Sequence, residues 1–312
     1  MNAADSFLEE NQESPTLSAI EQLTTEEMGF DKAGEAYFSP CGTMISFQAV
    51  PKGEKDYQIY IMDLNTRNIR EISQHMGACT CSFFRPDGKK IIFAGSHLNT
   101  PEPTGGGYKW DLTPYMNIYE TDLDGSSIKA ITTGSAYHAE CAYSPDGKEI
   151  VYASNEDGCM NLYIINSDGT NKRQITHDTH CYNGGPFFSP DGEQIIFRAD
   201  KDKPHYLQIY IIDKDGQNLR QMTQNHAVNW APFWHPSKKG FAYTTSIHGH
   251  HAYEIYYYSF NSCHHYRLTY HKGFDGLPSF DASGTKMLWT SKRGRGNTSQ
   301  VFIANFNIED FP

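Results

Sequence analysis

Long apolar runs are absent from this chain, and positive charge is scarce. No stretch approaches the ~18 apolar residues that a membrane-spanning helix needs, so we expect no membrane insertion. Lys and Arg number 26 against 37 Asp and Glu, for a net charge of −11. Because nucleic-acid binding relies on a clustered basic surface that neutralises phosphates, this balance argues against a nucleic acid as partner.

Several signatures of catalysis and targeting are also missing. No Gly-x-Ser-x-Gly nucleophile elbow occurs, and the glycine run at 105–107 lacks the Gly-Lys-Ser/Thr ending of a phosphate loop. The seven cysteines are an odd set, which fits a reducing compartment better than a disulfide framework. The first residues have no basic and apolar signal-peptide pattern. We therefore expect a cytoplasmic protein, or a periplasmic one if a signal peptide was removed before this numbering.

One short motif returns along the chain. An aromatic residue and a small or polar one are followed by Pro, Asp and Gly, with variations, at residues 38–42, 84–88, 143–147, 188–192, 234–238 and 280–284. Most steps between copies are 45 or 46 residues, and the second copy is followed by a longer one. Self-similarity at such a period is typical of repeat architectures. This period indicates a four-stranded propeller blade.

The third copy shows what one unit contains. Pro presets φ and Gly supplies the positive φ of a tight turn, after which residues 149–154 read as a strand rich in β-branched and aromatic side chains. Residues 161–166 read as the next strand, and 173–176 as a short last one. Because a single unit cannot bury its own faces, neighbouring units must stack.

The last unit ends too early to contain its own fourth strand. Residues 20–24 repeat the fourth-strand pattern at the other end of the chain. We therefore predict an all-β fold, a six-bladed β-propeller of four-stranded antiparallel blades, whose ring is closed by the N-terminal strand completing the last blade. We expect a disordered lead-in at residues 1–16, one propeller domain at 17–312, and a monomer.

The combined repeat resembles that of TolB-like six-bladed β-propellers, the PD40 or WD40-like β-propeller repeat family. The resemblance lies in Phe-Ser-Pro-Asp-Gly, in Ile-Tyr followed by Asp or Asn and Asp-Gly, and in a terminal Gln-Ile/Leu-Thr. It extends over roughly residues 20–306. Such propellers serve as protein-binding platforms and as accessory parts of peptidases and carbohydrate-acting proteins, so the resemblance implies a binding function.

Strand direction indicates which face carries function. The loops joining strand four to strand one share a face with those joining strands two and three, opposite the Pro-Asp-Gly turns. We call the face with these loops the mouth face, and the face with the Pro-Asp-Gly turns the turn face. Binding residues concentrate on loops held by a rigid scaffold, so we expect them on the mouth face.

Alignment on the motif places two sets of residues near the mouth of the central channel. Seven positions before the Pro stand Ala33, Cys79, His138, Asn183, Asn229 and Asp275. Five positions before it stand Glu35, Cys81, Glu140, Gly185, Ala231 and Leu277. We expect Glu35, His138, Glu140, Asn183, Asn229 and Asp275 to converge on one ligand or cation.

The oxygen donors of this set suit Ca²⁺, which accepts carboxylate and amide oxygens without strict geometry. The tentative metal ligands are Glu35, Asn183, Asn229 and Asp275, which resemble in position the metal site of six-bladed gluconolactonase- and paraoxonase-like hydrolases. The alternative is that a wet channel needs polar walls that water satisfies.

Longer loops supply a second group of candidates at the mouth. His97 and Arg198 belong to it, as do Tyr108 and Trp110 of the insertion at 99–115, and Trp230 is a further ligand-binding candidate. Tyr and Trp often dominate recognition surfaces, although a plain connecting loop would also explain the insertion.

Two functional hypotheses remain. The first is a non-catalytic binding or scaffold propeller that recognises a protein or peptide on the mouth face. The second is a Ca²⁺-type hydrolase or lyase acting on a carbohydrate or lactone, with His138 as general base. We favour the binding hypothesis and leave the question of enzymatic activity open.

Overall fold

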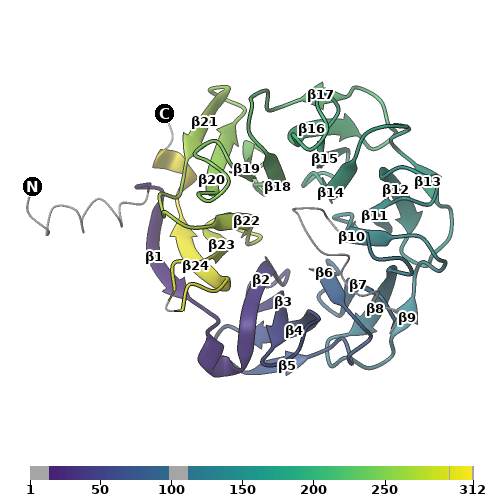
Figure 1. Cartoon of the computed structure of the whole chain (residues 1–312), viewed down its shortest axis with the longest axis horizontal. Helices are drawn as coiled ribbons and strands as arrows, with labels where there is room; N and C mark the ends of the chain where they lie inside the picture. Colours follow the sequence, from purple (N-terminus) through teal and green to yellow (C-terminus); the bar gives the residue numbers. More distant parts are fainter. Residues whose placement is uncertain (1–13, 98–111, 295, 311–312) are drawn as a thin grey trace, which may run out of the picture.

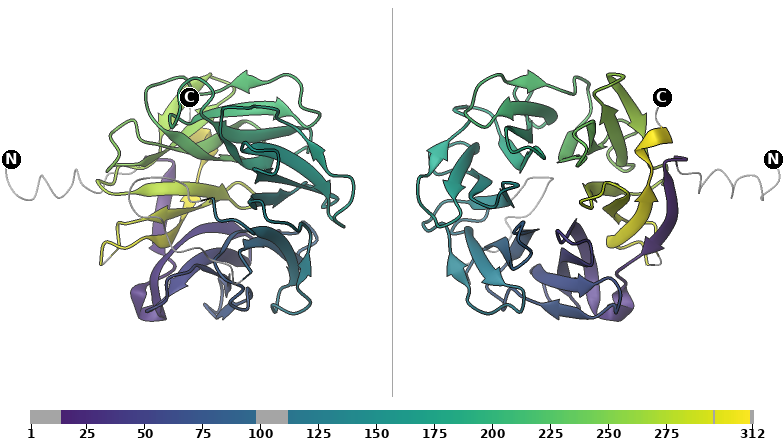
Figure 2. Two further views of the ribbon diagram at one scale, coloured as in Figure 1. Left: turned by 45° about the vertical axis from the view of Figure 1, so that its right-hand side comes forward. Right: turned by 180° about the vertical axis from the view of Figure 1, so that it is seen from behind.

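The computed structural model describes residues 14–97, 112–294 and 296–310. Six four-stranded antiparallel sheets surround a central axis as the blades of a propeller (Figure 1). The described chain ends lie beside the same blade, as the view from behind also shows (Figure 2). Within the described ranges, no helix is long and apolar enough to cross a membrane. The predicted fold class is confirmed.

Five blades take their strands from consecutive stretches of chain. Blade 1 contains β2 (Phe30–Phe38), β3 (Met44–Pro51), β4 (Gln58–Asp63) and β5 (Ile69–Glu71). Blade 2 contains β6 (Cys79–Phe84), β7 (Lys90–Gly95), β8 (Asn117–Asp122) and β9 (Lys129–Ala130). Blade 3 contains β10 (His138–Tyr143), β11 (Glu149–Ser154), β12 (Asn161–Asn166) and β13 (Arg173–Gln174). Blade 4 contains β14 (Asn183–Phe188), β15 (Gln194–Ala199), β16 (Gln208–Asp213) and β17 (Arg220–Gln221). Blade 5 contains β18 (Asn229–Trp234), β19 (Gly240–Thr245), β20 (Glu254–Ser259) and β21 (His264–Arg267).

The sixth blade joins the two ends of the chain. It contains β22 (Asp275–Phe280), β23 (Lys286–Ser291), β24 (Gln300–Phe306) and β1 (Leu17–Gln22). β1 pairs antiparallel with β24, so that Leu17 lies opposite Phe306 and Gln22 opposite Phe302. Two short 3₁₀ helices, η1 (Glu26–Met28) and η2 (Ile308–Asp310), flank this junction. The N-terminal strand therefore closes the ring, as the repeat pattern predicts.

A hydroxyl at the end of each fourth strand explains the terminal Gln-Ile/Leu-Thr signature. In blade 3, Thr176 Oγ1 accepts a hydrogen bond from the Leu162 amide at 2.9 Å and donates to Asn161 Oδ1 at 2.8 Å. Thr24 repeats this arrangement in blade 6, where it bonds the Val301 amide at 2.9 Å and Gln300 Oε1 at 2.8 Å. The hydroxyl thus ties the outermost strand to the third strand of its own blade.

The Ser-Pro-Asp-Gly turn is a structural element. Ser144 Oγ accepts a hydrogen bond from the Glu149 amide at 2.9 Å and donates to Asp146 Oδ1 at 2.7 Å. Gly147 has φ +69°, the left-handed region that glycine adopts at little cost. The serine therefore stabilises the turn, which agrees with its repetition in several blades.

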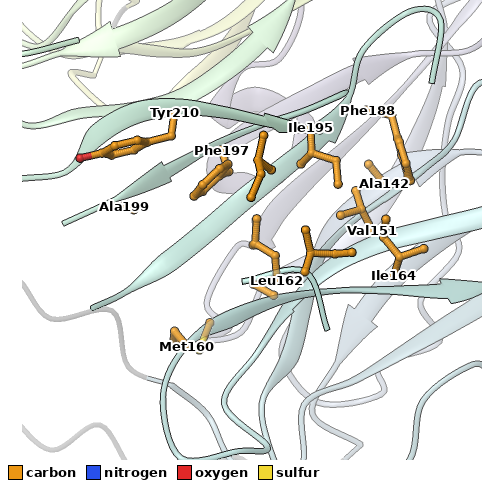
Figure 3. Close-up of a cluster of buried hydrophobic side chains, with 13 residues drawn as sticks. Ala142, Val151, Met160, Leu162, Ile164, Phe188, Ile195, Phe197, Ala199 and Tyr210 are labelled. Atoms are coloured by element: carbon orange, nitrogen blue, oxygen red, sulfur yellow. The ribbon is translucent and has the colours of Figure 1, made fainter. Parts of the chain in front are cut away.

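The hydrophobic core lies between neighbouring blades. Between blades 3 and 4, Val151, Leu162, Phe188, Ile195 and Phe197 belong to one buried cluster (Figure 3). Each Å² of apolar area removed from water contributes about 25 cal/mol to the stability of the folded state. The stacking of successive blades therefore stabilises the ring. The rigid ring in turn sets the innermost strands around the central channel.

Candidate functional site

The innermost strand of every blade contains a β-bulge that redirects its side chains. The pairing register shifts in β2, β6, β10, β14, β18 and β22. At the bulge, five positions before the motif Pro or its equivalent, φ is positive in all six blades, at Glu35, Cys81, Glu140, Gly185, Ala231 and Leu277. A bulge interrupts the alternation of side chains between the two faces of a strand. Residues on its two sides therefore do not share one face.

The residues seven positions before the Pro are buried, and the Nδ2 atoms of Asn183 and Asn229 have hydrogen-bond partners nearby. Asn183 Nδ2 donates to Met160 O and to Asp178 Oδ2, both at 3.1 Å. Asn229 Nδ2 donates to Gln208 Oε1 at 2.9 Å and to Asn225 Oδ1 at 2.8 Å. These partners belong to the preceding blade or the loop that follows it, so both amides join neighbouring blades.

Asp275 and His138 occupy the same position in their blades. Arg293 Nη2 lies 2.5 Å from Asp275 Oδ2, and Trp289 Nε1 donates to Asp275 Oδ1 at 3.3 Å. His138 is buried, and its ring lies edge-on to Tyr152 with centroids 6.0 Å apart. Burial lowers the pKa of His138, which favours the neutral imidazole. Its Nδ1 has no hydrogen-bond partner among the described residues.

Each of the tentative metal ligands has its own partners in the structure. Asn183 and Asn229 bind groups of the preceding blade, whereas Asp275 binds Arg293 and Trp289 of its own blade 6. Glu35 lies at the bulge, where φ is +45°. In the part of the chain that the structure describes, no three His, Cys, Asp or Glu side chains are grouped for metal binding. The bulge thus begins between the residues seven positions before the Pro and those five positions before it, which the aligned repeats suggest form one ring.

The bulge residues themselves form the channel wall and divide it by polarity. Glu35, Cys81 and Glu140 stand on blades 1 to 3, while Gly185, Ala231 and Leu277 stand on blades 4 to 6. Glu35 and Glu140 are close enough that the charge of Glu140 contributes to raising the pKa of Glu35. One side of the channel is therefore acidic, and the other is small or aliphatic.

Glu140 forms a buried ion pair with Arg198 of β15. Arg198 Nη2 lies 2.8 Å from Glu140 Oε1, and the two side chains are only 6% and 8% exposed. Tyr182 Oη donates to the same oxygen at 2.9 Å, and the Gly185 amide donates to Oε2 at 2.5 Å. A Cβ on Gly185 would lie 2.1 Å from Arg198 Nη1, so glycine there leaves the space that the guanidinium fills.

Glu35 is the second channel carboxyl and has a different environment. Tyr37 Oη donates to Glu35 Oε1 at 3.3 Å, and the Glu35 amide donates to Thr290 Oγ1 at 2.9 Å. Burial first, and then the nearby charge of Glu140, raise the pKa of Glu35 to about 7, although Cys81, the charge of Arg198 and the Tyr37 hydroxyl lower it in part. Within the described ranges no Lys, Arg or His lies within ion-pair distance of Glu35.

Below these residues, aromatic rings fill the channel. Tyr37, Phe83, Phe187 and Phe233 lie three positions before the motif Pro in blades 1, 2, 4 and 5. Their ring centroids lie 5.4 Å apart for Tyr37 and Phe83, 5.6 Å for Tyr37 and Phe187, and 4.9 Å for Phe187 and Phe233. Because blades 1 and 4 face each other across the axis, these rings form an aromatic floor beneath Glu35 and Glu140.

On the turn face, this floor closes a cavity of about 260 Å³. Its walls are the aromatic residues of the floor together with motif residues such as Pro40, Trp234 and Phe280. The sequence predicts no binding site on this face. The channel thus has two unlike ends, a charged one at the mouth and an apolar one at the turns.

The rim of the mouth carries an aromatic cluster. Trp230 is partly buried, and its ring centroid lies 6.3 Å from that of Tyr253 and 6.2 Å from that of Phe274. His97 is exposed, with its ring 6.0 Å from that of Tyr119. The other two predicted anchors, Tyr108 and Trp110, lie outside the described residues.

The sequence predicts Glu35, Glu140 and Arg198 as ligand-binding candidates but not the residues around them. Tyr182 and the aromatic floor were not predicted. The signal for the floor is present in the repeat, because four of the six copies carry Tyr or Phe three positions before the Pro or its equivalent. The signal for Tyr182 is weaker, since its role depends on where Arg198 lies.

A family model and several curated proteins match parts of this chain in sequence. A family model described as the dipeptidyl peptidase IV (DPP IV) N-terminal region matches residues 135–259. "Dipeptidyl-peptidase 5" of Porphyromonas endodontalis is 29% identical over 38% of this chain and 16% of its own. The "Tol-Pal system protein TolB" of Alcanivorax borkumensis is 32% identical over 30% of this chain and 21% of its own. The matches thus span less than a quarter of these two relatives.

Two solved structures share the architecture over nearly the whole chain. "Putative TolB from Agrobacterium tumefaciens" has a TM-score of 0.61 at 16% identity, covering 88% of this chain and 91% of that one. An "oligogalacturonate lyase in complex with manganese" has a TM-score of 0.60 at 15% identity, covering 96% of each chain. The protein is therefore a six-bladed β-propeller. Its repeated motif and these matches make it similar in fold to TolB.

Proposed function

We propose that this protein is a binding propeller that takes a protein or peptide segment on its mouth face. The observation that carries the proposal is the combination at one mouth of an aromatic rim with a charged channel centre. Trp230, Tyr253 and Phe274 supply large contact surfaces beside the channel. Glu35 and Arg198 supply polar groups that can fix the orientation of a ligand.

The chemistry of this mouth suits recognition better than turnover. Aromatic residues and arginine are enriched where binding energy concentrates, and the surrounding contacts exclude water. Glu140 and Arg198 form a buried ion pair, so a ligand that covers it does not leave Glu140 as an unpaired charge. The TolB-like architecture agrees with a platform that presents loops around a rigid ring.

The test uses a displayed library of random peptides selected on the full-length protein. Trp230→Ala removes the rim anchor, and Ile247→Ser changes an exposed residue of the same face, with 52% exposure. The control, Leu219→Ser, changes a residue of similar exposure, 46%, on the turn face. We expect Trp230→Ala and Ile247→Ser to weaken the affinity for the selected peptides by tenfold or more, which corresponds to about 1.4 kcal/mol per tenfold. Leu219→Ser should leave this affinity unchanged. Equal binding by all three variants would refute a mouth-face site.

A carbohydrate-directed hydrolase or lyase is the second candidate. It is favoured by the buried His138, whose neutral ring has an Nδ1 without a partner among the described residues, and by the similarity to an oligogalacturonate lyase. The test measures bound metals in protein purified without chelator and the shift of Tm on adding Ca²⁺, Mn²⁺ or EDTA. A ligand that binds only the folded state raises Tm. Identical Tm values under all conditions, for the wild type as for Asn229→Ala, would count against the metal-dependent candidate.

A further inference from the structure

We propose that the centre of the mouth is a socket for one lysine side chain of the captured segment, with its ammonium group at Glu35. This inference rests on the proposed binding function and names the chemistry that the channel would recognise. It follows from three features of the socket: how its charges are paired, what lines its apolar wall, and what closes its floor.

The charges are paired unequally. The two carboxylate oxygens of Glu140 accept hydrogen bonds from Arg198, Tyr182 and the Gly185 amide. Among the described residues, Arg198 is the ion-pair partner of Glu140. Glu35 accepts a hydrogen bond from the neutral Tyr37 hydroxyl at 3.3 Å, and the charge of Arg198 acts on it from beyond ion-pair distance. In the described part of the channel, Glu35 is thus the carboxyl group without an ion-pair partner, and an added cation would lie there.

The backbone places this carboxyl at some cost. Glu35 has φ +45°, a left-handed conformation that is unfavourable for a residue with a Cβ. The bulge directs Glu35 to the channel side rather than into the space between blades. Its amide is held by Thr290 of the adjoining blade 6, so the side chain starts from a fixed point.

The neighbouring apolar wall and the floor suit an aliphatic stem. Leu277 of blade 6 and Ala231 of blade 5 occupy the positions that correspond to Glu35 in the ring. Below them the channel is closed by the floor rings of Tyr37, Phe187 and Phe233. Lysine lays its methylene stem on apolar surface while its head reaches a polar partner, and aromatic faces attract an ammonium group.

Other ligand chemistries fit the socket less well. An anion would face Glu35 and Glu140 across a low-dielectric channel, where like charges repel strongly. A Ca²⁺ ion takes six to eight oxygen ligands, but both oxygens of Glu140 already accept protein donors. A single primary ammonium with an apolar stem satisfies Glu35 without displacing Arg198.

The test compares three small probes on the full-length protein by NMR titration at pH 8. Nα-acetyl-lysine N-methylamide carries the side-chain ammonium, and its norleucine counterpart has a similar stem without charge. Norleucine N-methylamide with a free amine carries only an amino-terminal ammonium. The variant is Glu35→Gln, and its matched control is Glu193→Gln on the turn face, where the side chain is 65% exposed and pairs with Lys214.

We expect the wild type and Glu193→Gln to bind the acetyl-lysine probe at least about tenfold more tightly than its norleucine counterpart, the ratio of one charge-assisted hydrogen bond. Glu35→Gln should abolish that preference while its Tm stays at or above that of the wild type. The absence of a preference in the wild type, its survival in Glu35→Gln, or tighter binding of the free-amine probe would overturn the lysine assignment. If peptide binding still depends on Trp230 and Ile247 in that case, the proposed binding function stands and only the lysine site is refuted.

Discussion

Glu35→Gln should stabilise the protein above neutral pH and have little effect in acid. The pKa of Glu35 is raised from 4.5 to about 7 in the folded protein, mainly by burial. Because the folded state holds the proton more tightly than the unfolded chain, the wild type has its full stability below about pH 4.5. That stability is lost as the pH rises through 7. Glutamine has nearly the same shape and cannot ionise, so it avoids this loss.

The magnitude follows from the difference between the two pKa values. At 1.36 kcal/mol per pKa unit, the wild type loses about 3 kcal/mol of folding free energy between pH 4.5 and pH 8. The groups that face Glu35 are Glu140, Arg198, Tyr37 and Cys81. Burial raises the pKa values of Tyr37 and Cys81, so these two stay protonated over this range.

The assay is urea unfolding followed by tryptophan fluorescence at several pH values between 4.5 and 8. The quantity of interest is the variant minus the wild type, because burial also raises the pKa of Glu254 to about 7 and this effect cancels in the difference. Glu193→Gln is the control and should give no pH-dependent difference. A Glu35→Gln advantage that does not grow with pH, or a variant less stable than the wild type at pH 8, would refute the assignment of Glu35 as an ionisable channel carboxyl.

Three further substitutions test the architecture around the site. Gly185→Ala should displace Arg198 and leave Glu140 unpaired, lowering stability by about 3–5 kcal/mol, whereas Gly42→Ala, with similar φ and open space around the Cβ, should cost only about 1–2 kcal/mol in thermal unfolding. Thr24→Val should cost about 1–3 kcal/mol, because Gln300 and the Val301 amide lose a buried partner; an unchanged Tm would contradict the role of Thr24 in ring closure. Phe187→Ala should enlarge the 260 Å³ cavity and increase binding of an apolar dye, and unchanged dye fluorescence would contradict a closed aromatic floor.

Local chemistry made much of the fold predictable. Pro and Gly of the repeated turn restrict φ in ways that depend only on neighbouring residues, and the period of the motif counts the blades. The closing strand was recognisable because Thr24 is required for the same hydrogen bonds as Thr176. Glu35, Glu140 and Arg198 were predictable as candidates because charged residues at repeated positions near a channel mouth stand out in an alignment of the copies.

Only the tertiary structure decided how these side chains are oriented. The bulge lies at Glu35, Cys81, Glu140, Ala231 and Leu277 in five of the blades, and none of these residue types signals a positive φ. The register shift between the innermost strand and its neighbour accompanies that conformation in every blade. Arg198 reaches Glu140 because Gly185, on the adjacent strand, leaves room for it. A contact that depends on the volume of a residue elsewhere in the fold is set by packing, which a pattern of residue types along the chain does not contain.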